Sequence, residues 1–556
     1  MRGPFDVAVL GSGFAGSLSA RLLRALGRSV LLVERGSHPR FAIGESSSPL
    51  ANLLLEGLCR RYGLGDILPL ASWGSWRRRY PEIGGGLKRG FTFYGHRFGE
   101  PFAAAADRSD QLLVAASPSD EVADTHWYRA DVDHFLQRRA QEAGAEYVDR
   151  TELEAVSFAG GAWTLETRRS GRRRTFRARL LVDASGPGGC LPRALDLGAA
   201  DFPGLPATEG LFTHFTGVRR IDAMGVLAPE EEAPPYPPDD AALHHVFPGG
   251  WIWLLRFANG ITSAGVAAVP SLARTLRLEE GAAAWGRLLA RLPTVREQFA
   301  DARAVLPFVY RSRLPFRAAR AAGPGWTLLP SAAAFVDPIL STGFPLTLLG
   351  IERLIGAVER RRGDEGLSAA LERDGVRTLA EADTAARLVA ALYARFSDFP
   401  VFAALTHLYF AAASYAEAAR RLERPALSGA FLSGDHPLFG DALRACCAAA
   451  LDERGETREA LLARIGRAIA PLDVIGLADA DGRRRNWYPV DAADLRAAAH
   501  KLGATPGEID ALVERMGRPI DAAAPATPTP SSASGSSSDA AAPRRAGRAA
   551  PPAPPR

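Results

Sequence analysis

The stretch DVAVLGSGFAGSLSARLLRAL, residues 6–26, decides the fold. Its apolar start, DVAVL, predicts a buried strand, and the apolar spacing in SLSARLLRAL predicts a helix immediately afterwards. The turn between them carries a GxGxxG pattern, formed by Gly11, Gly13, Phe14, Ala15 and Gly16. Glycines at these spacings let a pyrophosphate approach the amides at the start of a helix. The stretch therefore predicts a Rossmann-like α/β fold that binds a dinucleotide; the alternative is a tight turn without a ligand.

Later segments favour FAD over NAD as that dinucleotide. The next predicted strand, SVLLVE, ends at Glu34, where a carboxylate can accept hydrogen bonds from an adenosine ribose. The segment ARLLVDASGPGG predicts a strand that enters a small-residue turn at Asp183 and Gly186, where the chain can return to the same ligand. A third segment, DPILSTGFPLTLLGIERL, places Asp337 shortly before a helix that starts near Gly343. Elsewhere no GxGxxG follows a strand, so the sequence does not indicate a separate NAD(P)H domain.

The composition is that of a globular chain. Of 556 residues, 47% are hydrophobic and 23% are charged, and the formal net charge of +5 is small for this length. No basic stripe is interleaved with aromatic residues, so we do not expect nucleic-acid binding. The sequence shows no run of about eighteen apolar residues and no charged leader before an apolar stretch, which predicts no membrane span and a cytoplasmic location. The four cysteines lack the spacing of metal ligands, and no metal site is expected.

Three regions differ in composition. Residues 1–360 alternate strand and helix signals and include the hairpin cue WLLRFANGITSAGVAA, in which Asn259 and Gly260 predict a type I′ turn. We interpret this region as a composite FAD-binding and substrate-binding domain with an inserted antiparallel β-sheet. Residues 361–522 carry Ala, Leu and Arg at helical spacing and predict a mostly helical region. Residues 523–556 are rich in Pro, Ala, Ser and Arg and predict a disordered tail.

Six motifs follow one another along the chain: GSGFAG, IGESSSP, GLKRGFTF, DASG, GGWIW and DPILSTG. In these motifs the chain resembles the flavin-dependent halogenases, a group that includes the tryptophan halogenases, within the wider group of FAD-dependent monooxygenases. The resemblance covers roughly residues 6–359. It implies that a separate flavin reductase supplies reduced FAD, which reacts with oxygen to give a flavin hydroperoxide. In that family halide attack then yields hypohalous acid, which travels through a tunnel to a lysine beside the substrate.

Lys88 stands at the position of that lysine and is the predicted catalytic residue. Of the 67 lysines and arginines in the chain, only Lys88 and Lys501 are lysines. An amine can be neutral or protonated, and burial can lower its pKa towards neutrality, whereas a guanidinium stays charged at any working pH. The retained lysine suggests that the identity of this side chain matters. The alternative is an ordinary exposed lysine.

Two further loops match parts of the family's flavin site. Ser341, Thr342 and Gly343 match its halide site, and the amides that start a helix attract an anion. The alternative is that this helix start only stabilises negative charge on reduced flavin. Gly44 and Glu45 match a loop that in the family touches FAD and can signal its occupancy to the substrate side. For this loop the alternative is a simple cap of the following helix.

Two tryptophans on a predicted strand are candidates for the substrate cavity. Trp251 and Trp253 are two residues apart and therefore face the same side of a sheet. They resemble the start of the family's WxWxIP motif, which is thought to hold the substrate away from flavin, but Leu255 and Arg256 replace its isoleucine and proline. Ordinary core tryptophans are the alternative. Leu340 stands where tryptophan-specific members carry a glutamate, which argues against free tryptophan as the substrate.

The expected substrate is a small electron-rich aromatic, a phenol or pyrrole, either free or tethered to a carrier protein. Such a ring stabilises cationic charge and can lose an acidic proton, for which His96, His244 and His245 are candidate bases. The sequence does not choose between chloride and bromide. One alternative function is an FAD-dependent monooxygenase or dehydrogenase of the same fold that uses no halide. Another is a flavin-binding protein without turnover.

Overall fold

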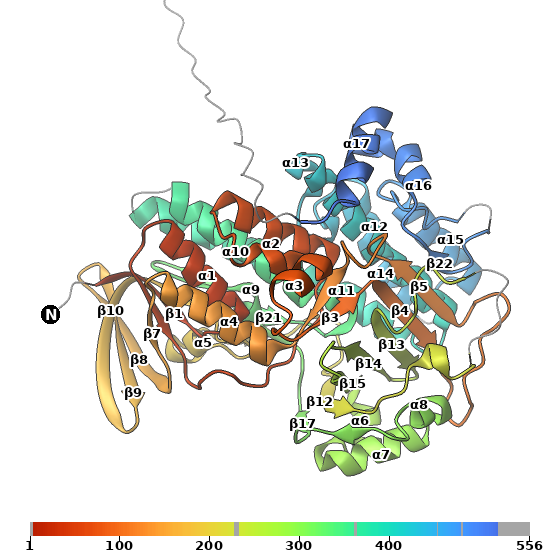
Figure 1. The fold of residues 1–556 in the computed structure, drawn as a ribbon, viewed down its shortest axis with the longest axis horizontal. Helices are drawn as coiled ribbons and strands as arrows, with labels where there is room; N and C mark the ends of the chain where they lie inside the picture. Colours follow the sequence, from red (N-terminus) through yellow and green to blue (C-terminus); the bar gives the residue numbers. More distant parts are fainter. Residues whose placement is uncertain (1–3, 227–232, 361–363, 453, 480–481, 521–556) are drawn as a thin grey trace, which may run out of the picture.

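The computed structural model describes residues 4–226, 233–360, 364–452, 454–479 and 482–520. Two large sheets lie towards opposite ends of an elongated body, with long helices running alongside both of them (Figure 1). The predicted disordered tail, residues 523–556, lies outside the described residues.

The first sheet is the predicted dinucleotide-binding sheet. Its strands follow the order β19-β20-β10-β1-β2-β7, and β1 pairs in parallel with both β10 and β2. Val7 and Val9 pack into the main hydrophobic cluster, whereas Ala8 and Leu10 pack into another cluster, because successive side chains of a strand point to opposite faces. The path strands are β1 (Phe5–Leu10), β2 (Val30–Val33), β7 (Glu146–Val148), β10 (Arg172–Asp183), β19 (Ala322–Gly323) and β20 (Trp326–Leu328).

Helices α1, α4 and α10 pack together at this end of the molecule, which also carries a hairpin. Helix α1 packs against α4 and against α10. The hairpin extends away from the sheet because β9 pairs antiparallel with the outer part of β10, and β8 pairs with β9 (left in Figure 1). These elements are α1 (Phe14–Ala25), α4 (Arg129–Glu142), α10 (Gly343–Arg360), β8 (Thr151–Ala159) and β9 (Ala162–Arg169).

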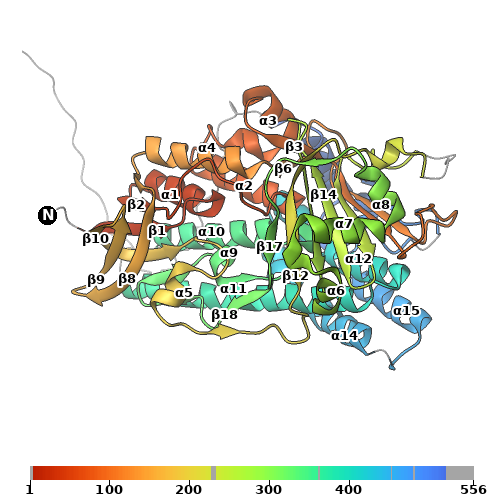
Figure 2. The ribbon, with the colours of Figure 1, turned by 90° about the horizontal axis from the view of Figure 1, so that it is seen from below.

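The second sheet is the predicted inserted antiparallel sheet. Its order is β16-β12-β15-β14-β13-β4-β5-β22, with β17 beside β12, and the neighbours pair antiparallel except β4 with β13 and β5 with β22. Three short helices, α6 to α8, cover one face (Figure 2), and the other face packs into the main hydrophobic cluster. The strands are β4 (Gly90–Gly95), β5 (Gln111–Ala115), β12 (Glu209–Thr216), β13 (Ala242–Phe247), β14 (Gly250–Arg256), β15 (Thr262–Ala268), β16 (Arg303–Ala304), β17 (Val309–Arg311) and β22 (Trp487–Tyr488). The helices are α6 (Pro270–Leu276), α7 (Ala282–Ala290) and α8 (Pro293–Gln298).

The turn between β14 and β15 differs from the predicted type. The hairpin itself forms, but only Gly260 of the Asn259-Gly260 pair has a positive φ, +81°. A type I′ turn requires positive φ at both central residues, so that prediction is wrong. Instead the Gly260 amide donates to the Phe257 carbonyl, and the amide of Phe257 donates to the carbonyl of Ile261. The five-residue connection lets Asn259 keep an ordinary conformation, while its side-chain oxygen accepts from the Ile261 amide.

The region after residue 363 is mostly helical, as predicted. Its helices are α11 (Asp364–Ala394), α12 (Phe399–Arg421), α13 (Pro425–Ser428), α14 (Phe439–Leu451), α15 (Arg458–Ile469), α16 (Ala492–Ala497) and α17 (Pro506–Met516). Helix α12 packs against α2 (Pro49–Arg61) and β5, and β22 joins the second sheet. The region shares one hydrophobic cluster with both sheets, so these helices form part of the same core. A domain boundary near residue 360 stays a prediction.

In the part of the chain that the structure describes, two helices are long and apolar enough, by length and composition, to cross a membrane. They span Ile339–Arg360 and Phe399–Arg421, and 78% of each apolar window is buried inside the protein. Burial of this extent is what the core helices of a large domain show.

A two-stranded ribbon joins the two ends of the molecule. In this ribbon β3 (Gly85–Lys88) pairs antiparallel with β6 (Asp124–Trp127). A side chain at Gly86 would place its Cβ 1.9 Å from the Arg256 carbonyl oxygen, so the ribbon can cross the end of β14 only because residue 86 is glycine. The remaining short elements are α3 (Trp73–Arg79), α5 (Cys190–Ala194), α9 (Pro330–Ala333), β11 (Ala199–Ala200), β18 (Phe316–Ala318) and β21 (Ala334–Phe335).

Candidate active site

The GxGxxG turn lies between the end of β1 and the start of α1. Gly11 has φ +97°, and a Cβ there would lie 2.6 Å from Cα of Ser185. A Cβ at Gly16 would lie 1.9 Å from the Gly11 carbonyl oxygen. Glycine is therefore required at both positions by main-chain contacts. The structure also brings the DASG turn against this loop, since Leu10 and Asp183 are register partners and the Ala184 amide donates to the Leu10 carbonyl.

Two guanidinium groups lie beside the middle glycine of this turn. A Cβ built at Gly13 would lie 3.5 Å from Oδ2 of Asp133, 3.6 Å from Nη2 of Arg129 and 3.9 Å from Nη2 of Arg40. Arg129 forms a two-pronged ion pair with Asp133, at 2.7 and 2.8 Å. A glycine cradle at a helix start with two cations beside it suits a pyrophosphate. The residues therefore fit the diphosphate of FAD.

Glu34 directly follows the last residue of β2, which ends one position before the predicted strand end, and turns towards the glycine loop. Its carboxylate accepts hydrogen bonds from the Ser12 amide at 2.9 Å and the Gly36 amide at 2.8 Å. Burial opposes ionisation of the carboxyl, but Arg40 and these amides outweigh it and hold the pKa of Glu34 below its usual value. Glu34 is thus an anion that orders the turn, and its contact with ribose stays a prediction.

The start of α10 faces the start of α1. The rings of Phe14 and Phe344 stack with centroids 4.7 Å apart, and the neighbouring Ala15 is buried. Leu340 and Ser341 have positive φ values of 64° and 52° and turn the chain into α10 at Gly343. The first amides of a helix have no acceptor within it, so this end offers donors and positive potential to an anion.

Asp183 and Asp337, the acidic residues of the second and third flavin segments, accept hydrogen bonds from other groups of the protein. Asp183 accepts from the Ser185 amide at 2.8 Å and the Leu191 amide at 2.7 Å, while Gly186 has φ +81° in the same turn. Asp337 accepts from Trp251 Nε1 at 3.2 Å and from the Tyr393 hydroxyl at 2.9 Å. Burial raises the pKa of Asp337 to about 6, although these hydrogen bonds oppose the rise.

Asp337 consequently joins three parts of the fold. Its partners come from the second sheet through Trp251 and from α11 through Tyr393, and the Thr208 hydroxyl lies 3.4 Å away. The residue was predicted from sequence to contact the cofactor. In the structure Asp337 connects the chain just before Ser341 with the tryptophan pair. A direct contact of Asp337 with the cofactor stays a prediction.

The loop that contains Gly44 and Glu45 links the glycine turn to the second sheet. Arg129, which lies beside Gly13, donates to the Gly44 carbonyl at 2.8 Å. The buried Glu45 carboxylate lies 2.8 Å from Nε2 of His214 on β12. Ser48 caps α2, so the helix-cap interpretation also holds for this segment. The loop therefore contacts both the predicted cofactor side and the predicted substrate side.

Lys88 is fully buried at the end of β3. Its amine donates a hydrogen bond to the Ser47 carbonyl and lies 3.8 Å from the centroid of the Phe91 ring. Burial lowers the pKa of Lys88 to about 7, against the attraction of Asp124, which favours the ammonium form. The expectation of a shielded amine with a near-neutral pKa therefore agrees with the structure, and the exposed-lysine alternative does not.

The amine belongs to a buried group that we call the lysine cluster. Asp124 is the cross-strand partner of Lys88, and its Oδ1 accepts from Asn52 Nδ2 at 3.0 Å. Burial raises the pKa of Asp124 to about 8, and Lys88 opposes this rise. The cluster consists of Asn52, Lys88, Phe91, Asp124, His126, His244 and Tyr409, all of them buried. Sequence analysis missed Asn52, Asp124, His126 and Tyr409, although the alternating strand DTHW could have indicated two polar side chains on one face.

The three candidate histidine bases lie on different faces of the second sheet. His244 faces the lysine cluster: its ring stacks on Phe93 at 4.3 Å, and its Nδ1 lies 3.0 Å from the Thr92 carbonyl oxygen. His96 and His245 pair with each other at 2.8 Å, and His245 reaches Gln298 of α8 at 2.9 Å. The latter two belong to the helix-covered face, so the structure places neither of them beside Lys88.

Trp251 and Trp253 share one face of β14, with ring centroids 5.6 Å apart. Both belong to the main hydrophobic cluster, whereas Ile252 and Leu254 belong to the cluster on the other face. Trp253 Nε1 donates to the Ser263 hydroxyl at 3.3 Å. Both tryptophans therefore lie on the face of the sheet that packs into the main hydrophobic cluster, which also contains the fully buried Leu340.

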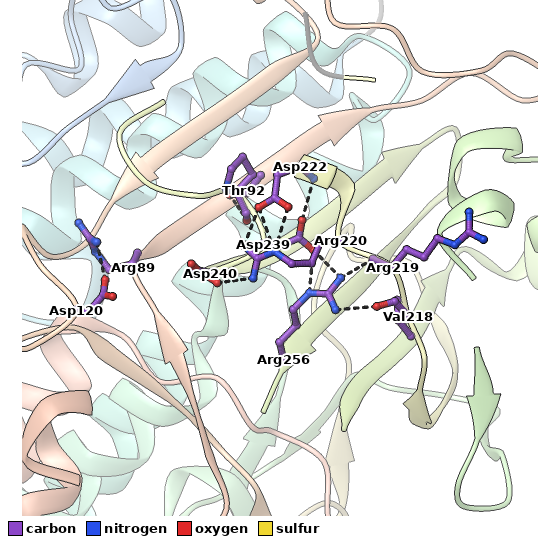
Figure 3. A network of polar contacts seen from close by, with 11 residues as sticks. Arg89, Thr92, Asp120, Val218, Arg219, Arg220, Asp222, Asp239, Asp240 and Arg256 are labelled. Atoms are coloured by element: carbon purple, nitrogen blue, oxygen red, sulfur yellow. Dashed lines mark hydrogen bonds and ion pairs between the residues drawn. The ribbon is translucent and has the colours of Figure 1, made fainter. Parts of the chain in front are cut away.

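Arg256, at the place of the motif's proline, anchors the end of β14. Its Nε donates to Asp239 at 2.8 Å and its Nη1 to the Val218 carbonyl at 2.9 Å (Figure 3). Arg220 joins the same network through Asp222 and Asp240. A proline could make none of these ion pairs, so this chain fixes the strand end by charge.

The fold and the site define a flavoprotein of the oxidoreductase type: a glycine cradle at a helix start, a second helix start facing it, and a loop leading to a buried amine. The comparison with family models agrees, because the model described as FAD dependent oxidoreductase matches residues 6–337. The chain belongs to this family and is predicted correctly as an FAD-dependent oxidoreductase.

The resemblance to flavin-dependent halogenases is also confirmed. Tetracycline 7-halogenase of Kitasatospora aureofaciens is 31% identical over 357 residues, which are 62% of this chain and 61% of that protein. Monodechloroaminopyrrolnitrin halogenase PrnC of Pseudomonas fluorescens is 28% identical over 73% of this chain and 70% of its own length. The crystal structure of halogenase PltM in complex with phloroglucinol and FAD shares the fold, with a TM-score of 0.75 at 24% identity over 86% of this chain and 98% of that one. The match therefore spans about three fifths of the first relative's length.

Proposed function

We propose that the protein is an FAD-dependent halogenase that installs chlorine or bromine on an electron-rich aromatic ring, a phenol or pyrrole. The observation that carries the proposal is the buried Lys88 amine, held against an aromatic ring by the loop that Arg129 links to the glycine turn. In a chain with two lysines among 67 basic residues, such a placement supports a chemical role for the amine. The passage between flavin and Lys88 stays a prediction.

Different residues of the chain would bind the cofactor, the halide and the halogenating reagent. Gly11, Gly13 and Gly16 would hold the FAD diphosphate, and the amides at Thr342 and Gly343 would hold a halide. Reduced FAD bound there, with oxygen and halide, would supply hypohalous acid. Lys88 would then donate a hydrogen bond to this reagent or bind its halogen, because an amine with a pKa near 7 is available in both protonation states.

The substrate would lie between the ribbon and the second sheet. Phe91, His244 and Trp251 provide aromatic surface there, and Leu340 offers no carboxylate to stabilise an indole cation. A phenol or pyrrole, whose own oxygen or nitrogen stabilises that charge, therefore suits the site better than tryptophan. The ring could be free or carried by a carrier protein, and a separate reductase would provide reduced FAD.

A halide-independent monooxygenase is the second candidate, and the departure at Arg256 favours it. Where that motif holds a substrate away from flavin, this chain has an arginine bound in an ion-pair network. If the altered strand end admits the substrate to the flavin, oxygen transfer to the ring would compete with halogenation.

One assay separates the two candidates. The purified protein is given FAD, NADH, a flavin reductase, chloride or bromide and a panel of phenols, and the products are identified by mass spectrometry. We expect halide-dependent halogenated products, lost in Lys88→Ala with FAD still bound, and retained in the control Lys501→Ala. Hydroxylated products that do not depend on halide would contradict the proposal and support the second candidate.

A further inference from the structure

The lysine cluster contains polar atoms that the fold leaves without partners. Asp124 Oδ2 is buried and makes no hydrogen bond within the described part of the chain. The His126 ring, also fully buried, makes no hydrogen bond of normal geometry to any described residue, although the Ala241 carbonyl lies near it. Both side chains point to the same face of β6 as their cross-strand neighbour Lys88, because they are two residues apart and register pairs share a face.

Such an arrangement is unfavourable without a ligand. Leaving a buried polar group unpaired costs free energy, and most buried polar atoms in folded proteins are paired. Here the unpaired atoms belong to two residues on the same strand face as Lys88, whose amine lies over the Phe91 ring, and Phe91 in turn stacks with His244. A ligand that satisfies them combines an aromatic ring with a polar hydrogen on its edge.

We propose that Asp124, with His126 beside it, is the base that takes the acidic proton of the substrate, a phenol O–H or a pyrrole N–H. This proposal rests on the proposed halogenase function, and it narrows the substrate to rings that carry such a hydrogen. Asn52 positions the carboxylate by donating to Oδ1, which leaves Oδ2 directed to the ligand.

For a phenol the step balances as follows. The O–H bond breaks, its electron pair stays on the substrate oxygen, and the proton moves to Asp124. The ring carbon then forms a bond to halogen while the oxygen–halogen bond of hypohalous acid breaks, and the departing hydroxide takes the proton from Asp124 to become water. The intermediate then loses the proton of the halogenated carbon to water and gains a proton from water at its oxygen. The sum is ring C–H plus hypohalous acid giving ring C–halogen plus water.

The electrostatic surroundings suit this base. Burial raises the pKa of Asp124 to about 8, and the neighbouring cation of Lys88 opposes the rise. A base with a pKa near the working pH is effective both as acceptor and as donor. The other titratable or charged groups that act on Asp124 or Lys88 are His126 of β6, His244 of β13, and Tyr409, Glu417 and Arg421 of α12.

The first experiment uses the scarcity of lysine. Protein with FAD bound and labelled with ¹³Cε-lysine has two signals, one for Lys88 and one for Lys501, assigned with Lys501→Arg. We expect Asp124→Asn to lower the titration midpoint of Lys88 and leave that of Lys501 in place. We also expect 3-methoxyphenol to move the Lys88 signal in the wild type and much less in Asp124→Asn, and 1,3-dimethoxybenzene to leave it unmoved. The proposal would be overturned if Asp124→Asn left the titration midpoint of Lys88 unchanged and 3-methoxyphenol did not move the Lys88 signal.

The second experiment measures turnover with the same two probes and bromide. We expect Asp124→Asn to reduce bromination of 3-methoxyphenol at least about 100-fold, while the slow reaction of 1,3-dimethoxybenzene, which has no acidic proton, changes little. Equal losses for both probes, or a loss under about 3-fold for the phenol, would overturn the proposal. If the wild type brominates neither probe, the halogenase function fails, and the signal shifts above still decide whether Asp124 faces the phenol.

Asn52→Ala tests the same carboxylate if Asp124→Asn does not bind FAD. Loss of the Asn52 hydrogen bond should raise the pKa of Asp124, because that bond favours the ionised form. The acidic limb of the pH profile for 3-methoxyphenol bromination should therefore move to higher pH. An unchanged acidic limb in a variant that retains FAD would overturn the role of Asp124.

Discussion

The glycine turn and the lysine cluster are built in opposite ways. The glycine turn is made of main chain: its requirements are two glycines, a strand end and the first amides of α1, all within residues 5–25. The lysine cluster is made of side chains that come from α2, β3, β4, β6, β13 and α12, between residues 52 and 409. The comparison teaches that a backbone site tolerates no added atom, whereas a side-chain site depends on the charge and pairing of groups brought together by the fold.

The largest expected effect comes from adding one atom to the backbone site. Gly16→Ala should weaken FAD binding at least about 100-fold, because its Cβ would meet the Gly11 carbonyl oxygen at 1.9 Å. Flavin absorbance of the purified variant and titration with FAD measure this. The matched control is Gly57→Ala in α2, where a Cβ meets nothing within 4 Å and should leave FAD affinity unchanged. An FAD affinity of Gly16→Ala equal to that of the control would break the comparison.

Asp337→Asn should change how the stability of the protein depends on pH, because burial raises the pKa of this carboxyl. The pKa of Asp337 is raised to about 6 from 3.8, so the folded protein binds a proton that the unfolded chain has released over this range. Wild-type stability from this group therefore falls as pH rises from 4 to 6, by about 2 kcal/mol. Asp337→Asn should lack this fall and gain stability relative to wild type as pH rises.

Urea unfolding between pH 4 and pH 6 measures that difference. The control is Asp441→Asn, since the Asp441 side chain is 83% exposed. The prediction fails when the stability of Asp337→Asn follows pH in parallel with the wild type.

Lys88→Met should separate function from stability. Halogenated product should be lost, whereas stability should respond to pH in the opposite sense from Asp337. The pKa of Lys88 is lowered to about 7 from 10.5, so above pH 7 the unfolded chain holds a proton that the folded protein has released. Wild type should therefore gain about 2 kcal/mol over Lys88→Met as pH rises from 7 to 9.

In that variant Asp124 has lost its neighbouring cation and should stay protonated, which does not reverse the sign. Unfolding free energies of both proteins at several pH values check the prediction, with Lys501→Met as the control. A constant difference between pH 7 and pH 9 would show that the amine is not shielded from water.

Glu45→Gln should have the smallest effect and should sharpen the comparison at the connecting loop. The amide retains an oxygen for His214 but removes the charge, so we expect a change of about 1 kcal/mol in the coupling between FAD and substrate binding. Titration of FAD with and without 3-methoxyphenol measures that coupling. Glu56→Gln, whose partner is Arg60 on the same helix, serves as the control. Unaltered coupling in Glu45→Gln would leave the loop with a purely structural role.

Most of the fold could be predicted from local pattern. The strand, glycine turn and helix of residues 6–26, the order of the later flavin segments and the helical region all form as expected. The type I′ turn at Asn259 could not be recognised as wrong, because the length of the connection depends on how β14 and β15 pair. Trp251 and Trp253 were placed on one face correctly, since period two along a strand follows from sequence alone.

The candidate site could be predicted only in part. Lys88 was found through its rarity and through a family resemblance, but Asn52, Asp124 and Tyr409 carry no comparable signal. Of the histidines, His244 was selected together with His96 and His245, although these latter two lie on the helix-covered face. Alternation along a strand shows which side chains share a face of the sheet. It does not show which of the two faces packs against the ribbon β3–β6.

What the sequence by itself determined is the cofactor end: consecutive residues specify a glycine turn and a helix start, because those structures need only local φ/ψ freedom and free amides. What only the tertiary structure decided is which residues surround Lys88. Burial by distant segments lowers the pKa of its amine, and the pairing of β3 with β6 sets Asp124 opposite it. Among the described residues, Asp124 Oδ2 and the His126 ring then have no hydrogen bond of normal geometry. These properties arise from desolvation and from contacts across hundreds of residues, and neither is written in any short stretch of the chain.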